Sequence, residues 1–137
     1  MLDEFFENYI EAALWSTNDE SDESGGDPLD DNYDDTDIDP GTLASLKLEC
    51  EAFLIEAEPL ILEAEELIER GEWKLPDGSN YSVVAYAGHD FWLTRNEHGC
   101  GYWDGDWPDK IGEALTALSE KFDVINLCVG DDGKIYS

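Results

Sequence analysis

Apolar residues at three- and four-residue spacing predict two amphipathic helices in the first half of the chain. Residues 2–15 carry the first pattern, with acidic residues in the first turn, where they complement the helix dipole. Residues 43–68 carry the second pattern. Pro59 interrupts it, because proline removes a backbone donor and disfavours helix at the preceding residue. The second pattern therefore predicts either one kinked helix or two helices that meet near Glu58.

Shorter elements are expected after the second helix. Residues 81–86 favour a helical turn over a strand. A first hairpin is predicted from a strand at residues 89–95, a turn at 96–99 and a returning strand at 100–103. A further helix is expected to begin at residues 105–108, with Pro108 suited to its first turn, and to run through Phe122.

A second hairpin is predicted at the end of the chain. Residues 124–129 read as a buried strand, Asp131-Asp132-Gly133 as a turn and residues 134–136 as the returning strand. The order of elements favours an α+β fold. In that fold, N-terminal amphipathic helices pack on a small antiparallel sheet of two hairpins with one further helix.

Residues 18–40 separate the two helices and contain eleven acidic side chains and no basic one. Glycines and prolines exclude a long regular element there, which predicts an acidic mobile loop held at Leu29, Tyr33 and Ile38. A calcium site is the specific alternative, because Asp35, Asp37 and Asp39 alternate as the first ligands of an EF-hand loop do. Leu46, however, occupies the position where that loop requires glutamate.

Composition adds a strong negative charge to this pattern. The 137 residues include 35 Asp and Glu against 7 Lys and Arg, a formal net charge of −28. The length is that of one domain, 1–137, and the hydrophobic fraction of 42% is typical of a globular chain. The negative field repels nucleic acid and anionic membranes and attracts basic proteins. We therefore expect a basic protein partner, no direct nucleic-acid partner and no membrane partner.

Three widely spaced cysteines, Cys50, Cys100 and Cys128, suit reduced thiols packed in a core better than a disulfide framework. No basic leader precedes the first apolar run, and no apolar run is long enough to span a bilayer. These features predict a cytoplasmic protein. The sequence leaves the oligomeric state open, with a dimer as one alternative.

The aromatic block around residues 87–106 holds the side chains with the most varied chemistry. His89, His98, Cys100, Asp104 and Asp106 are potential metal ligands, but their spacing is not that of a zinc site, so no metal and no cofactor is expected. Cys100 beside His98 is poorly placed for nucleophilic catalysis. We therefore expect no enzyme. The block is interpreted as structural, through His89, Asp90, Trp92, Arg95 and Trp103.

The stretch AGHDFWLTRNEHGCGYWD, with the ending VGDDGKIYS, resembles a group of small acidic proteins encoded by tailed bacteriophages. LDDNYDDTDI is similar to the acidic loop of the same group, so the likeness covers most of the chain in patches. Here Glu97 stands where a glycine would give an Asn-Gly turn, and Cys100 where a smaller residue is usual. The resemblance implies a phage early or accessory protein that acts in a bacterial cell. It implies no particular activity.

Charge is the feature that points to a function. Carboxylates one or two helical turns apart stand about 5 to 11 Å apart, and duplex DNA carries one charge per about 1.7 Å of its axis. Rows of carboxylates could therefore imitate phosphates and occupy the nucleic-acid groove of a host protein. The residues expected to bind such a partner are Glu49, Glu56, Glu58, Glu63, Glu65, Glu66, Asp30, Asp31, Asp34 and Asp35.

Two other classes of function stay open. The first is an acidic adaptor that binds a partner other than a nucleic-acid-binding protein through Trp92, Trp103 and Trp107, since tryptophans are frequent hot spots of interfaces. The second is a small metal-dependent enzyme, which metal analysis of the purified protein would test.

Overall fold

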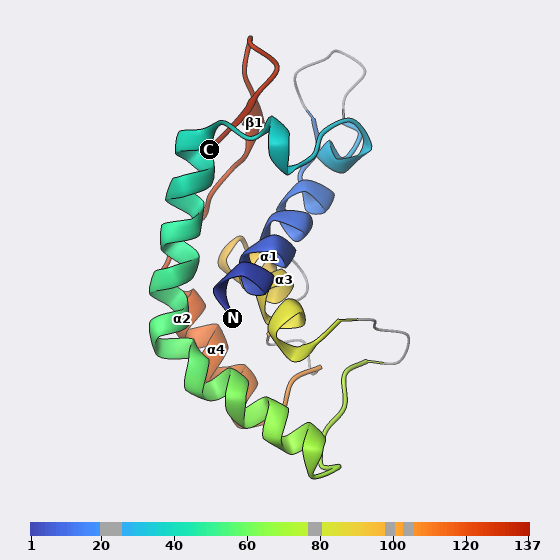
Figure 1. The fold of residues 1–137 in the computed structure, drawn as a ribbon, viewed down its shortest axis with the longest axis vertical. Helices are drawn as coiled ribbons and strands as arrows, with labels where there is room; N and C mark the ends of the chain where they lie inside the picture. The colour runs from blue at the N-terminus through green and yellow to red at the C-terminus, as the bar shows by residue number, and fades with distance from the viewer. Residues whose placement is uncertain (20–25, 77–80, 98–100, 103–105) are drawn as a thin grey trace.

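The computed structural model describes residues 1–19, 26–76, 81–97, 101–102 and 106–137, and it is mostly helical (Figure 1). The helices are α1 (Leu2–Ser16), α2 (Pro40–Glu69), α3 (Val83–Arg95) and α4 (Asp109–Ser119). Two 3₁₀ turns, η1 (Leu29–Asp31) and η2 (Asp35–Asp37), lie between α1 and α2. Two short strands, β1 (Cys128–Val129) and β2 (Ile135–Tyr136), end the chain.

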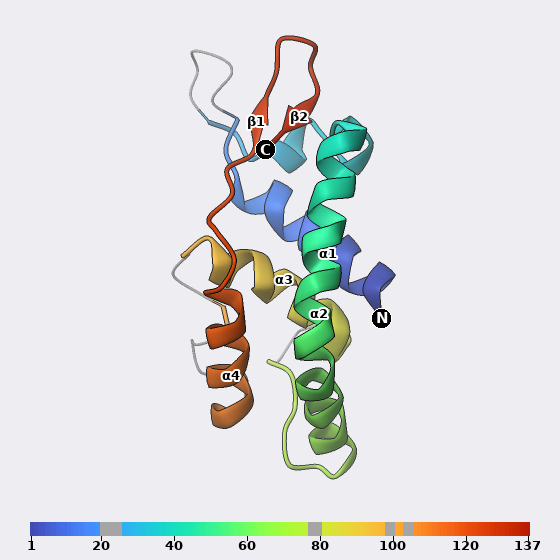
Figure 2. The same ribbon diagram turned by 90° about the vertical axis from the view of Figure 1, so that its left-hand side faces the viewer.

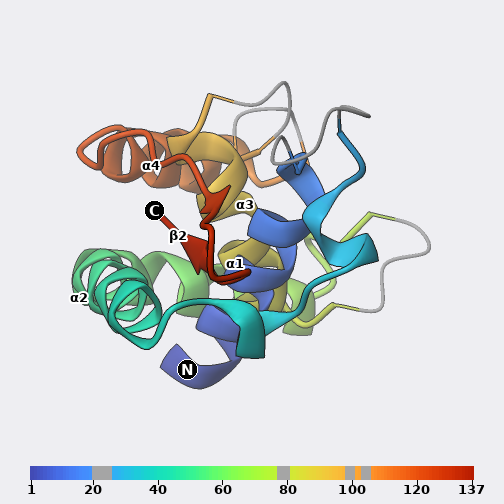
Figure 3. The same ribbon diagram turned by 90° about the horizontal axis from the view of Figure 1, so that it is seen from above.

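The helices form two layers. α1 and α3 lie against each other in one layer (Figure 2), and α2 and α4 lie together on one side of that pair when the molecule is seen from above (Figure 3). Burying apolar stripes of helices against one another is one of the stable ways to build a core. Phe53 of α2 and Phe91 of α3 meet at the centre, with ring centroids 4.0 Å apart.

α1 confirms the first predicted helix, and its tight packing on α3 depends on a glycine. The buried face of α1 includes Phe5, Tyr9 and Ala13. A Cβ atom added to Gly88 of α3 would stand 2.1 Å from the backbone oxygen of Phe5. Only glycine therefore allows the two backbones to approach this closely.

α2 is one continuous helix, which is the kinked form of the second prediction. The Asp39 side chain accepts a hydrogen bond from the backbone nitrogen of Thr42, and Pro40 stands at the first helical position. Pro59 lies inside the helix, whose axis bends partway along its length in Figure 1. Proline is the usual cause of such a bend. Gly71, with φ of 74°, follows the last turn.

The first predicted hairpin is wrong, because residues 89–95 belong to helix α3. Ser82 caps this helix by accepting a hydrogen bond from the backbone nitrogen of Ala85 at 3.1 Å. Nearly every residue of α3 is buried, so the run is apolar without the one-sided pattern of a surface helix. A short apolar run of this kind fits a buried strand equally well. The predicted returning strand at 100–103 lies largely outside the described residues.

The fold class is corrected accordingly. Among the described residues the only sheet is the C-terminal antiparallel pair, in which Cys128 faces Tyr136 and Val129 faces Ile135. The buried strand predicted over 124–129 shrinks to β1, and the Val124 side chain is 51% exposed. The molecule is thus a bundle of helices with a small hairpin, and the helices do not pack on a two-hairpin sheet.

The cysteine prediction holds at one position and fails at another. Cys50 is fully buried on α2, and burial raises the pKa of its thiol. Cys128 is exposed, so the prediction that it is a core residue is wrong. Cys100 lies outside the described residues.

Candidate functional site

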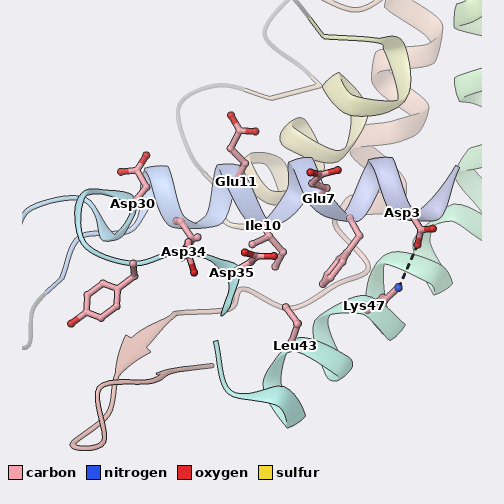
Figure 4. A pocket seen from close by; sticks show the side chains of 12 residues that line it. Asp3, Glu7, Ile10, Glu11, Asp30, Asp34, Asp35, Leu43 and Lys47 are labelled. Atoms are coloured by element: carbon pink, nitrogen blue, oxygen red, sulfur yellow. Dashed lines mark hydrogen bonds and ion pairs between the residues drawn. The ribbon is translucent and has the colours of Figure 1, made fainter. Parts of the chain in front are cut away.

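An acidic groove of about 550 Å³ runs between α1, the segment 30–35 and the first turns of α2 (Figure 4). Its floor is apolar and includes Phe6, Ile10 and Leu43. Acidic side chains from α1 and from the loop line the groove as well. In Figure 4 Glu7 and Glu11 project from the side of α1 that faces away from Ile10 and Leu43. The six acidic residues of the groove are Asp3, Glu7, Glu11, Asp30, Asp34 and Asp35.

Helical spacing places the α1 carboxylates on the groove. Asp3, Glu7 and Glu11 follow one another at four-residue intervals, so their side chains leave the same face of α1 about 6 Å apart along the axis. Phe6 and Ile10 have the same spacing one position earlier. The groove therefore has a line of anions beside a line of apolar side chains.

Backbone hydrogen bonds attach both ends of the loop to the rest of the molecule. The backbone nitrogen of Leu29 donates to Thr17 at 2.8 Å, and that of Asp39 donates to Ile135 at 2.9 Å. Leu29 and Ile38 are buried, and Tyr33 packs against the core, as the sequence predicted. Residues 26–40 thus follow a course fixed at both ends, whereas the mobility expected of residues 18–40 stays a prediction.

Asp34 is held in place by η2. Its carboxylate accepts hydrogen bonds from the backbone nitrogen of Thr36 at 2.9 Å and from the Thr36 hydroxyl, and these bonds lower the pKa of Asp34. The Asp37 carboxylate in turn accepts from the backbone nitrogen of Asp34 at 2.9 Å. This capping box keeps one groove carboxylate ionised and fixed in position.

The groove contains one cation, and that cation already has a partner. The Lys47 ammonium lies 3.5 Å from the Asp3 carboxylate and 5.9 Å from the ring centre of Phe6. The Asp3 side chain is almost fully exposed and that of Lys47 about half exposed, so the pair contributes little to stability. Five of the six groove carboxylates therefore keep their charge uncompensated by Lys47, and the groove suits a cationic ligand with an apolar part.

The carboxylates predicted to bind a partner fall into two groups. Asp30, Asp34 and Asp35 line the groove, and Asp31 is exposed beside them. The second group lies on α2, and in Figure 1 the far end of that helix is remote from the loop along the long axis. A single strip that joins the loop to the whole of α2 is therefore not formed.

The predicted α2 glutamates differ in their surroundings. Glu49 pairs with buried Arg95 at 3.1 Å, Glu56 with Lys121 at 3.7 Å, and Glu66 with Arg70 at 3.8 Å. Within the described ranges no ion pair involves the other three, which are Glu58, Glu63 and Glu65.

The described residues of the aromatic block lie mostly in the core. The Trp107 indole donates to the buried Asp90 carboxylate at 2.7 Å, and the Trp92 indole donates to the Ser16 hydroxyl at 2.7 Å. His89 Nδ1 lies 3.2 Å from Asp90. Trp92 and Trp107 are 1% and 3% exposed, so neither is available as the hot spot that the adaptor hypothesis needs. Trp103 lies outside the described residues.

Arg95 joins four parts of the chain. Its guanidinium is fully buried and donates to the Tyr9 hydroxyl at 3.2 Å, to Glu49 at 3.1 Å and to the backbone oxygen of Asp123 at 2.6 and 3.1 Å. Despite this neighbouring cation, burial raises the pKa of Tyr9. These contacts connect α3 to α1, α2 and the segment after α4.

The possible metal ligands are not brought together in the part of the chain that the structure describes, where no group of three His, Cys, Asp or Glu is arranged to hold an ion. Asp37 and Asp39, two of the EF-hand-like positions, instead cap η2 and α2. His98, Cys100 and Asp104 lie outside the described residues.

Sequence reasoning missed the α1 side of the groove. Glu7 and Glu11 lie outside the apolar positions of the predicted first helix, and nothing in the local pattern marks them as part of a groove. What closes the groove is the loop, whose path depends on contacts distant in sequence.

The fold and the groove define a small helical protein with an acidic groove on its surface. Comparison of the chain with protein-family models, with curated proteins and with solved structures finds no match. Among the described helices, none combines the length and the apolar character needed to cross a membrane.

Proposed function

We propose that this protein binds a basic surface of another protein, one that otherwise holds nucleic acid, and blocks it by DNA mimicry. The observation that carries the proposal is the groove, with six carboxylates around an apolar floor and a single, already paired cation. Lysine and arginine side chains that contact phosphates have aliphatic stems and charged ends. Such side chains would place their stems on Phe6 and Leu43 and their charges on Glu7, Glu11 or Asp34.

Charge elsewhere on the molecule supports this proposal. Of the seven basic residues, Arg95 is buried, and Lys47, Arg70 and Lys121 already have acidic partners. The long-range field is therefore strongly negative, which speeds association with a basic protein. The proposal assigns no catalytic residue and no cofactor to the chain.

The cellular setting follows from the resemblance to tailed-phage proteins. Under it, the protein acts in the cytoplasm of a bacterial host. Together with the acidic groove, this setting leads us to propose that it inhibits a host nucleic-acid-binding protein, either to counter host defence or to support host takeover. Dimerisation would double the acidic surface. Sedimentation of the purified protein measures its oligomeric state.

The test is competition by DNA. The immobilised protein is incubated with bacterial lysate, and the bound proteins are challenged with duplex DNA at salt concentrations between about 50 and 200 mM. We expect mass spectrometry to identify basic nucleic-acid-binding proteins that both DNA and salt release. A bound protein that neither DNA nor salt releases would contradict mimicry.

A matched variant locates the binding to the groove. Replacing Glu7, Glu11, Asp30 and Asp34 by their amides keeps the shape of these side chains and removes four charges. We expect this variant to lose the DNA-sensitive partners. Amide substitution of Glu113, Glu120 and Asp131, exposed residues away from the groove, is the control and should retain them.

A further inference from the structure

The outer side of α2 carries an exposed apolar stripe. Leu48, Ile55 and Leu62 are 66%, 76% and 46% exposed, and they recur at seven-residue spacing. Ala52 and Pro59 are also exposed and lie on the same side of the helix, because four residues advance the chain by about one turn. We call these five residues the α2 stripe.

The α2 stripe lies opposite the face that α2 buries. Leu46, Ala57 and Ala64 are fully or almost fully buried toward α1, α3 and α4. The helix is therefore apolar on two opposite sides, whereas a surface helix of a globular protein normally has one apolar face. In Figures 1 and 3 α2 forms an outer edge of the molecule, and no described element covers its outer side.

Two rows of glutamates flank the stripe, each at the same seven-residue spacing. Glu51, Glu58 and Glu65 form one row. Glu49, Glu56 and Glu63 form the other. The first row has no ion pair within the described residues, and in the second row Glu49 and Glu56 pair with Arg95 and Lys121 on the side toward α3 and α4.

The dimensions of the stripe match one helix. From Leu48 to Leu62 it spans fourteen residues, or about 21 Å along the axis. An apolar seam at heptad spacing with charged flanks is the pattern by which one helix recognises another along its length. In such pairs the charges of the flanking rows select the partner.

Charge complementarity selects the kind of helix. A second copy of this chain would set glutamate rows against glutamate rows, and the whole molecules, each with a formal charge of −28, would repel one another. An anionic lipid surface would be repelled in the same way. Nucleic acid would be repelled too. A helix with an apolar seam and flanking lysines or arginines would contact the stripe with its apolar side chains and pair its basic side chains with the glutamate rows.

We propose that the α2 stripe, between its two glutamate rows, binds an amphipathic helix of a basic partner protein. Leu48, Ile55 and Leu62 supply the apolar contact, and Glu51, Glu58 and Glu63 pair with the basic flanks. Binding at the stripe goes beyond the proposed mimicry, because it uses a different face from the groove and requires an apolar contact that imitation of phosphate does not.

The test uses a synthetic helix as the probe. One peptide of about eighteen residues carries leucines on one face with lysines beside them, and a control peptide of identical composition has the leucines distributed around the helix. We expect the first peptide to bind at least about tenfold more tightly than the control. Equal affinity, or no binding of the first peptide, would overturn the proposal.

Substitution in the stripe locates the binding. Replacing Leu48, Ile55 and Leu62 by serine should lower the affinity for the peptide with leucines on one face by about thirtyfold or more. The circular dichroism spectrum of the protein should stay unchanged. The single variant Ile55→Ser, at the most exposed of the three positions, serves if the triple variant does not fold, and we expect a loss of about fivefold. Undiminished binding by a folded stripe variant would overturn the proposal.

Two further measurements separate the other occupants. The groove variant with Glu7, Glu11, Asp30 and Asp34 as amides should bind the peptide through the stripe as tightly as the unaltered protein at moderate salt, and loss of binding would place the peptide in the groove instead. Sedimentation equilibrium tests for a dimer formed through the stripe. We expect the unaltered protein and the serine variant to show the same oligomeric state. A dimer that dissociates on serine substitution would assign the stripe to a second copy.

Discussion

Arg95 is a buried cation whose hydrogen bonds connect α3 to α1, α2 and the segment after α4. The Arg95→Met variant keeps much of the side-chain volume but leaves the Tyr9 hydroxyl and the Asp123 carbonyl without their donor. We expect a loss of about 3 kcal/mol or more in the free energy of unfolding, because the variant leaves buried polar groups without hydrogen-bond partners. Urea denaturation measures it.

Lys121→Met is the matched control. It removes an ion pair between two side chains that are each more than half exposed, and such a pair is worth at most about 1 kcal/mol. Equal losses for the two variants would show that Arg95 is not a structural hub.

Asp34 provides a pH-dependent contact at the edge of the groove. Because the hydrogen bonds from Thr36 lower the pKa of Asp34 in the folded protein, its contribution is present above the ordinary pKa of an aspartate. It is lost as the pH falls through the lowered value. Thr36→Val removes the hydroxyl bond and should move the pKa of Asp34 back toward its ordinary value. A carboxyl-carbon NMR titration measures the shift, and an unchanged pKa would contradict the assigned cause.

At the scale of elements, the crossing of α1 and α3 depends on Gly88. The Gly88→Ala variant gains helix propensity worth about 1 kcal/mol, but its Cβ meets the Phe5 carbonyl. Overpacking of this kind costs about 1–3 kcal/mol or more, so we expect a net loss of stability in chemical denaturation.

Gly41→Ala, near the exposed start of α2, is the control for this substitution. The nearest atom to its new Cβ is the end of the Asp39 side chain at 3.1 Å, and we expect a change within about 1 kcal/mol. A Gly88→Ala variant as stable as the unaltered protein would mean that α1 and α3 can move apart without a loss in the free energy of unfolding.

The elements also show where a pattern was informative. α1, α2 and α4 have polar residues on at least part of their surface, so the spacing of their apolar residues predicts a helix. α3 is buried almost all round, and its run of Val83, Ala85, Ala87 and Phe91 has no polar face to reveal the helical period.

At the scale of the whole molecule, self-repulsion should make stability depend on salt. The Debye length falls from about 30 Å at 0.01 M to about 3 Å at 1 M ionic strength, so added sodium chloride screens the net charge of −28. We expect the Tm to rise by several degrees over this range, as measured by circular dichroism.

A less charged variant is the control for the salt effect. With Asp31, Glu58, Glu63 and Glu113 replaced by their amides, the starting Tm at low salt should be higher and its rise with salt smaller. A Tm that is insensitive to salt in both proteins would mean that the carboxylates are too far apart to destabilise the fold.

The sequence by itself determined the helices with an exposed polar side, the small C-terminal hairpin and the negative charge. Each of these depends on neighbours within a few residues or on composition. Only the tertiary structure decided that residues 89–95 are helical, that Trp92 and Trp107 are buried, and that the loop closes a groove on α1. It also decided which side of α2 stays outside. These depend on contacts between residues distant in the chain, which local periodicity does not record.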